Sequence, residues 1–275
     1  MNAVHTAGEA LAALRDAKAG ATDFRTNFFP SEAKLQGWID HSELFSDVHE
    51  GATFFLRKDR DFWHLYFCAA SPDALQSQAA KLSILMAEPV VTDVVGNQPA
   101  LEELLARLES VGLRRYARLQ RMARAQLREP SPSPATGDSP VVCADKADCS
   151  AILALIESAF DRCAEQLPQL YEIESAVDHR QVLVAKRDQA VAGLLFFETQ
   201  GLASSIRFWA VARQFHSLGI GSLLMRHYFG TQSAVRRFTL WVNTVNENAI
   251  TKYGHYGYAP DGLVDHVLAN HIIPT

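Results

Sequence analysis

The segment from Val211 to Ser222, V-A-R-Q-F-H-S-L-G-I-G-S, carries the clearest chemical signal in the chain. It follows a predicted strand and opens a predicted helix. Gly219 and Gly221 allow unusual backbone dihedral angles and a close approach of the backbone to a ligand. Free amides at a helix N-terminus attract anions, so this junction suits a diphosphate. A simple tight turn is the alternative, since Leu224 replaces the third glycine of a dinucleotide fingerprint and no G-K-[ST] of a nucleotide P-loop is present.

A second patterned segment, T-V-N-E-N-A-I-T-K-Y-G-H-Y-G-Y, follows the strand predicted over residues 236–243. Asn246 is placed to cap a short helix. Ala249 and Tyr253 lie on that helix, and Gly257 and Tyr258 follow its end. Each of the two segments therefore follows a predicted strand and leads into a predicted helix, in two successive strand–helix units.

Taken together, these segments resemble the GNAT superfamily of Gcn5-related N-acetyltransferases. The coenzyme A loop of that family has the pattern V-x-P-x-x-[QR]-x-x-G-x-[GA], and Val211, Gly219 and Gly221 stand at its fixed places. The later family pattern, N-x-x-A-x-x-x-Y-x-x-x-G-[FY], is matched in full by the second segment. Arg213 stands where the family usually has Pro, and His216 where it has Gln or Arg. The resemblance covers nearly all of residues 141–275.

The resemblance implies that acetyl-coenzyme A is the co-substrate and that an amine attacks its thioester directly, without an acyl-enzyme. The residues that it assigns to the coenzyme are Val211, Arg213, His216, Ser217, Leu218, Gly219, Ile220, Gly221, Ser222 and Asn246. The neutral imidazole of His216 offers a phosphate less positive charge than the Arg that the family often has there. Arg213 is expected to supply part of the missing charge. A solvent-facing role for His216 and a plain capping role for Asn246 are the alternatives.

For catalysis, the resemblance makes Tyr253 the general acid that protonates the departing thiolate, because a phenol has a pKa of about 10. A core aromatic is the alternative. A base must remove the amine proton, since a lysine-like amine has a pKa of about 10.4. Glu198, near the end of a predicted strand, is the first candidate. The others are Glu172, Glu174 and Asp178, in the segment that the family uses to shape its acceptor pocket. For each of the four, an ordinary solvated carboxylate is the alternative and the more common case. No Ser/His/Asp or Cys/His arrangement is evident, and Cys163 is not favoured as a nucleophile.

The chain divides at residues 129–140, E-P-S-P-S-P-A-T-G-D-S-P, where four prolines exclude a helix or a central strand. We expect this segment to link an accessory half, residues 1–128, to a catalytic half, residues 141–275. The catalytic half is predicted as a helix over 147–160, strands over 181–187, 190–199 and 202–211, a helix over 219–233, the strand 236–243, a helix over 246–256 and a strand over 263–268. This order predicts a mixed α/β sheet with the GNAT-like fold.

The first half repeats that order in weaker form. It has a predicted helix over 7–19, a hairpin over 52–69, helical spacing over 72–87, a strand over 90–95 and a helix over 99–111. It is therefore predicted as a degenerate GNAT-like half. Because no glycine-rich loop follows Cys68, we expect it to bind no coenzyme. The arginine-rich run up to Arg128 fits a solvated face, or contacts with an acidic surface of the other half, better than a phosphate site.

Composition limits the remaining choices. The 275 residues carry a net charge of −5 and a pI near 6.1, which does not indicate a nucleic-acid binder. No stretch approaches the roughly 20 apolar residues of a membrane span, and no signal peptide is evident. The four cysteines show neither C-x-x-C nor zinc spacing, so we expect no metal and a reduced, cytoplasmic protein.

The leading hypothesis is an N-acetyltransferase whose acceptor is a primary amine of a small molecule or a peptide; a homodimer stays open. The main alternative is a non-catalytic module that senses acyl-coenzyme A or binds a partner. A donor with a longer acyl chain is a third hypothesis.

Overall fold

The computed structural model describes residues 1–19, 21–125, 141–271 and 273. Contacts divide the chain into an N-terminal unit, Met1–Leu119 with Gly262–Thr275, and a C-terminal unit, Gln120–Asp261. The chain therefore passes between the units twice, within β7 (Arg114–Ala125) and within β13 (Ala259–Ala269). These contacts do not follow the predicted division into residues 1–128 and 141–275. The predicted linker 129–140 lies outside the described residues.

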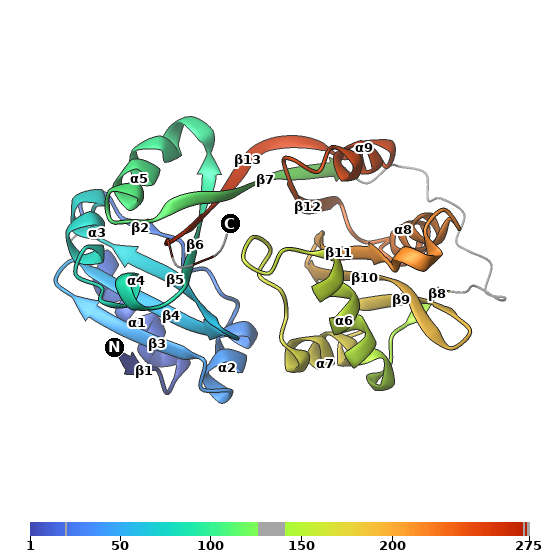
Figure 1. Ribbon diagram of the computed structural model, residues 1–275, viewed down its shortest axis with the longest axis horizontal. Coiled ribbons are helices and arrows are strands. Elements are labelled where there is room, and N and C mark those ends of the chain that lie inside the picture. The colour runs from blue at the N-terminus through green and yellow to red at the C-terminus, as the bar shows by residue number, and fades with distance from the viewer. Residues whose placement is uncertain (20, 126–140, 272, 274–275) are drawn as a thin grey trace. The chain divides into compact units, whose positions relative to one another are not determined.

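The sheet of the C-terminal unit has the strand order β7-β12-β11-β10-β9-β8 (Figure 1). Its strands besides β7 are β8 (Val141–Cys143), β9 (Val182–Arg187), β10 (Ala190–Gln200), β11 (Ala203–Val211) and β12 (Arg237–Asn243). Neighbours from β8 to β11 are antiparallel, and β11 and β12 are parallel. The predicted mixed α/β sheet is thus confirmed.

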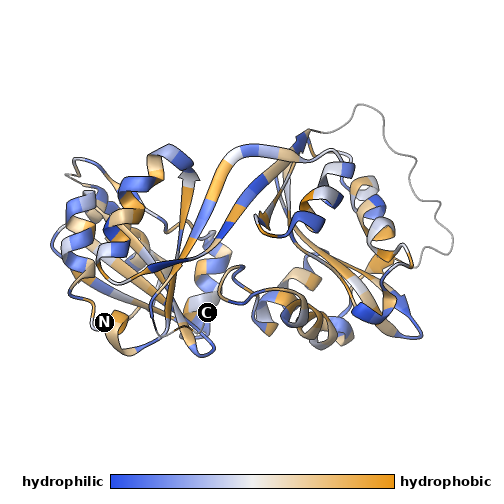
Figure 2. Cartoon of the chain, turned by 45° about the horizontal axis from the view of Figure 1, so that its top comes forward, coloured by the Kyte–Doolittle hydropathy of each residue, from blue (hydrophilic) through white to orange (hydrophobic). Residues whose placement is uncertain are grey.

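Helices cover both faces of this sheet. On one face α6 (Cys149–Ala159) and α7 (Leu170–Asp178) pack against residues such as Leu194 and Phe208. On the other, α8 (Ile220–Thr231) and α9 (Glu247–His255) pack against Leu195 and Leu240. Figure 2 shows the hydrophobic residues concentrated on the strands of each unit. Because side chains alternate along a strand, β11 sends Trp209 to the α8–α9 face, where the glycine loop also lies.

Most predicted elements of this half are confirmed within about two residues, because hydrophobic periodicity marks them strongly. The turns at Asp188-Gln189 and Gly201 are confirmed by left-handed backbone angles, with φ of 48°, 65° and 58°. The helix α7 and the short strand β8 were not predicted. Two 3-10 turns, Lys146–Asp148 and Arg213–Phe215, complete the unit.

The sheet of the N-terminal unit has the order β1-β3-β4-β5-β6-β13, with β2 paired to β5. Besides β13, its strands are β1 (Asn2–Ala3), β2 (Arg25–Thr26), β3 (Leu44–His49), β4 (Ala52–Asp59), β5 (Phe62–Ala69) and β6 (Val90–Asn97). Its helices are α1 (Ala7–Lys18), α2 (Glu32–Asp40), α3 (Pro72–Ala79), α4 (Ile84–Ala87) and α5 (Gln98–Ser110). The predicted hairpin, strand and flanking helices are confirmed. The segment 72–87, predicted from its helical spacing, forms two helices, α3 and α4. The helix α2 and the strands β1 to β3 were not predicted.

From Arg114 to Ala125 the arginine-rich run forms the strand β7. Its arginines meet acidic groups: Arg115 pairs with Glu102 at 2.9 Å and Glu109 at 2.8 Å, and Arg121 pairs with Asp261 at 2.8 Å. Arg115 thus pairs with carboxylates of its own predicted half, whereas Asp261 belongs to the other one, as the second interpretation had it. Arg128 lies outside the described residues. Among the described helices, none is both long and apolar enough to cross a membrane.

Candidate active site

The site begins where β11 and β12 part. Their parallel pairing runs from Ala203 opposite Arg237 to Ile206 opposite Leu240 and then stops. Arg207 is skipped in the pairing of β11 with β10, which makes a β-bulge. Because a bulge bends a strand, the last residues of β11 turn away from β12. The main-chain groups of these residues then lie along the gap between the two strands.

The glycine loop lies at the end of that gap. Gly219 caps α8 with φ of 72°, and Ser217 is also left-handed, with φ of 67°. No side chain caps this helix. Because the first amides of an α-helix have no partner inside the helix, they are available to an anion, and the helix dipole adds attraction.

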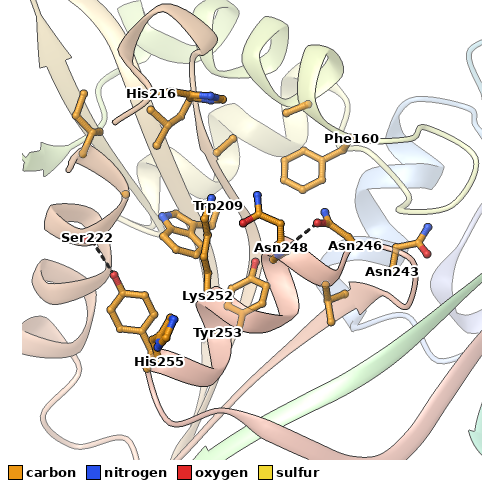
Figure 3. A pocket seen from close by; sticks show the side chains of 18 of the residues that line it. Phe160, Trp209, His216, Ser222, Asn243, Asn246, Asn248, Lys252, Tyr253 and His255 are labelled. Atoms are coloured by element: carbon orange, nitrogen blue, oxygen red, sulfur yellow. Dashed lines mark hydrogen bonds between the residues drawn. The ribbon is translucent and has the colours of Figure 1, made fainter. Parts of the chain in front are cut away.

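The second glycine is required by packing. A Cβ built on Gly221 would lie 3.0 Å from a ring carbon of Trp209. That indole also packs against Tyr253 and Tyr256, with ring centroids 5.4 and 5.9 Å away. The Tyr256 hydroxyl is 3.0 Å from that of Ser222 and links α9 to the first turn of α8 (Figure 3). The two helices are therefore held together around the mouth of the gap.

A cavity of about 1070 Å³ joins these features. Of the residues predicted from the sequence, it is lined by Val211, His216, Ser217, Gly219, Ile220, Gly221, Ser222, Asn246 and Tyr253. Arg213 and Leu218 belong to the same loop but are exposed and do not line it. The loop thus contributes its backbone and its small side chains to the cavity.

His216 has a different contact from the one expected. Its Nε2–H donates to the carbonyl oxygen of Val211 at 2.9 Å, so the imidazole closes the loop back onto the end of β11. Asn246 accepts from the amide of Ala249 at 3.1 Å and is the N-cap of α9, as its alternative interpretation had it, while also lining the cavity. Lys252 lines the cavity too and has no ion-pair partner among the described residues.

Tyr253 lies inside the cavity wall, 8% exposed (Figure 3). Burial raises the pKa of its phenol well above the usual value, and the negative charge of Glu165 raises it further. The phenol therefore keeps its proton throughout the neutral range. That is the protonation state that a general acid needs.

Glu165 is the carboxylate that the sequence did not single out. It lies in the segment between α6 and α7 and lines the cavity with Phe160 and Asp161. Burial raises its pKa to about 7, a backbone hydrogen bond from Asp161 lowers it, and the charge of Asp161 raises it. Its Oε2 is buried without a hydrogen-bond partner among the described residues. A carboxylate with a pKa near 7 in a cavity is suited to accept a proton at neutral pH.

The carboxylates named from the sequence are not at the cavity. Glu198 lies at the exposed end of β10 and pairs with Arg207 at 3.2 Å. Glu172 accepts from the amide of Gln169 and caps α7, and Asp178 pairs with Lys146. Glu174 is exposed on α7 and does not line the cavity. The geometry therefore gives none of them the position of a base.

In the part of the chain that the structure describes, no three His, Cys, Asp or Glu side chains are arranged to hold a metal ion. Cys163 is buried and does not line the cavity.

Comparison with known proteins agrees with this geometry. Residues 150–258 match the family model for the acetyltransferase (GNAT) family. Among solved structures, the chain is similar to a tandem GNAT protein from the clavulanic acid biosynthesis pathway, with a TM-score of 0.64 and 14% identity over 99% of this chain and 98% of that one. It is also similar to a GCN5-related N-acetyltransferase from Sphaerobacter thermophilus, with a TM-score of 0.58 and 15% identity over 96% and 91% of the two chains. At these identities the likeness concerns the fold. No curated protein matches the chain.

Proposed function

Residues 150–258 form a domain of the acetyltransferase (GNAT) family, and from this premise we propose that the protein transfers an acetyl group from acetyl-coenzyme A to a primary amine of a small molecule or a peptide. The observation that carries the proposal is the joining of two features in one cavity. Parted strands leave the edge of β11 open, and the uncapped N-terminus of α8 begins beside it.

Each part of the coenzyme has a complement in this cavity. The diphosphate suits the free amides that begin at Gly219, and Lys252 adds a positive charge. The amide-bearing pantetheine arm suits the open edge of β11, which can pair with it as a strand would. In this orientation the thioester points toward the part of the cavity lined by Tyr253 and Glu165.

The chemistry follows from these two groups. Glu165 removes a proton from the amine, directly or through a water molecule, and the amine nitrogen attacks the carbonyl carbon of the thioester. The tetrahedral intermediate then expels the thiolate as the carbon–sulfur bond breaks. The phenol of Tyr253 donates its proton to that sulfur, and the resulting phenolate takes up, directly or through a water molecule, the second proton that the attacking nitrogen must lose. Acetyl-coenzyme A and an amine thus become coenzyme A and an amide.

The alternative function is a sensor that binds acyl-coenzyme A without turnover. Glu165 favours the enzyme, because a carboxylate oxygen that is buried without a hydrogen-bond partner, as Oε2 is among the described residues, is costly unless the site uses it. The test is release of free thiol from acetyl-coenzyme A in the presence of a panel of amines. An enzyme releases thiol with at least one amine. Binding of the coenzyme by calorimetry, with no thiol released for any amine, would establish the sensor instead. Competition with longer acyl donors decides the acyl group.

A further inference from the structure

The N-terminal unit repeats the parted strands of the candidate site. Its β5 and β6 are parallel and pair only at Trp63 with Val90 and at His64 with Val91. Beyond His64 the two strands separate, as β11 and β12 do beyond Ile206. Each unit therefore has a gap of the kind that, in the proposed function, receives the coenzyme arm.

In the N-terminal unit, the chain itself fills this gap. The strand β2 pairs antiparallel with β5, with Arg25 opposite Ala69 and Thr26 opposite Cys68. The amide of Asp23 donates to the carbonyl of Ala70 at 3.1 Å. We call residues 23–27 the filling segment. It takes the edge of β5 that the departure of β6 leaves open.

Asn27 closes the gap from its other end. Its Oδ1 accepts from the amide of Phe67 at 2.6 Å, and its own amide donates to the carbonyl of Phe67 at 3.2 Å. Its Nδ2 lies 3.3 Å from the carbonyl oxygen of Leu65, 3.0 Å from Oγ1 of Thr92 and 2.9 Å from the carbonyl oxygen of Asp93. One side-chain amide thus satisfies main-chain groups of both strands.

The helix after the gap is closed as well. The N-cap of α3 is Ser71, whose hydroxyl accepts from the amide of Ala74 at 3.1 Å. Pro72 follows and has no amide hydrogen to offer. In the C-terminal unit the matching helix starts at Gly219 without a side-chain cap. Both features that suit a coenzyme are therefore satisfied internally in one unit and open in the other.

We propose that the filling segment is a built-in occupant of the N-terminal gap, with the amide of Asn27 in the place of an amide of the pantetheine arm. This unit then keeps the acyltransferase fold without a coenzyme site, and the chain binds one coenzyme. The expected stoichiometry of one coenzyme per chain rests on the proposed function of the C-terminal unit. The proposal that the filling segment occupies the N-terminal gap does not depend on that function.

Two measurements on the full chain test this. Calorimetric titration with coenzyme A is expected to give one site per chain in the wild type and none in Gly221→Val. Two sites per chain, or binding that survives in Gly221→Val, would overturn the proposal while leaving the C-terminal function standing. If the wild type binds no coenzyme, the proposed function fails, and the second measurement alone decides on the filled gap.

The second measurement is hydrogen exchange at the amide of Phe67. We expect slow exchange in the free protein, no change on adding coenzyme A, and exchange faster by about 10- to 100-fold in Asn27→Ala. Asn27→Asp keeps the acceptor for Phe67 but loses the donor, so it is the milder variant if Asn27→Ala does not fold. Asn2→Ala, at an exposed asparagine, is the matched control and should change nothing. Fast exchange of Phe67 in the wild type, or new protection on adding coenzyme, contradicts the filled gap.

Discussion

The sharpest prediction concerns Glu165 and the dependence of turnover on pH. If this carboxylate is the base, only its ionised form is active. With a pKa of about 7, roughly a tenth of it is ionised at pH 6 and roughly nine tenths at pH 8. The turnover number should therefore rise about tenfold from pH 6 to pH 8, approach a tenfold rise per pH unit only well below 7, and level off above pH 8. The acidic limb belongs to Glu165, because burial keeps the phenol of Tyr253 protonated over this range.

The variant Glu165→Gln keeps the size of the side chain and removes the proton acceptor. We expect kcat to fall by about 10²-fold or more, the usual contribution of a general base, and the acidic limb to disappear. The assay is thiol release at saturating acetyl-coenzyme A and amine from pH 5.5 to 9, corrected for uncatalysed thioester hydrolysis. Saturation matters because kcat/KM would also report the protonation of the free amine.

The matched control is Glu198→Gln, at the carboxylate that the sequence favoured. This side chain is exposed, pairs with Arg207 and lies away from the cavity, so the variant should keep the wild-type rate and pH profile. A wild-type kcat that does not change between pH 5.5 and 8 refutes the assignment of Glu165. So does an acidic limb that persists in Glu165→Gln and vanishes in Glu198→Gln.

The raised pKa of Glu165 also leads us to expect that the free energy of unfolding decreases with rising pH, whereas the turnover number increases. Its pKa is raised in the folded protein, so the folded state holds the proton more tightly, and stability falls as pH rises from the unfolded value toward about 7. A change from 4.5 to about 7 corresponds to at most about 3 kcal/mol. At pH 8, Glu165→Gln should thus unfold at a higher denaturant concentration than the wild type while being slower as an enzyme. Such a trade is typical of functional groups held in unfavourable surroundings.

Three further predictions concern other groups. Tyr253→Phe should lower kcat about 10²-fold with little change in the KM for acetyl-coenzyme A, measured by thiol release. Gly221→Ala should raise that KM about tenfold, because the new methyl group presses on Trp209, and adding Trp209→Leu should restore most of the loss. Burial and the charge of Asp93 raise the pKa of Asp265 well above the usual value, so stability falls as pH rises from the unfolded pKa of about 3.9 toward the folded one. Asp265→Asn should therefore stabilise the fold by about 1–3 kcal/mol at pH 8 and less at pH 5, measured by denaturant midpoints.

The glycine loop to which we assign the coenzyme could be placed from the sequence because its conformation depends on the backbone. Gly219 must adopt a left-handed conformation at the start of α8, and such positions select glycine. Gly221 is favoured for a different reason, since a Cβ there would press on the ring of Trp209. Both needs appear as glycines at fixed spacing after a strand, so the loop was found without knowledge of the packing.

The proposed base, Glu165, could not be predicted in this way, because its properties come from tertiary burial. Glu165 belongs to a connecting segment without periodicity, and only its apolar neighbours Cys163, Ala164 and Leu167, all buried, hint at its surroundings. The place of Glu198 near a strand end is compatible with a base, but carboxylates near strand ends are also commonly solvated. The fold-level features were easier, since the mixed sheet and most of its helices follow from periodicity.

The two units together show why the fold alone does not decide where a ligand binds. Both contain parallel strands that part, and both send a helix away from that gap. By our proposals the two units differ in coenzyme binding because buried polar main-chain groups must find partners. In the N-terminal unit Asn27 and Ser71 provide those partners from within the chain, through contacts up to 66 residues apart in the sequence. In the C-terminal unit His216 satisfies the carbonyl of Val211, but β12 no longer pairs with this end of β11, and no side chain of the described residues caps the amides after Gly219. In the proposed function, the free energy of satisfying these groups is available to a ligand that brings a phosphate at one end and amides along its length.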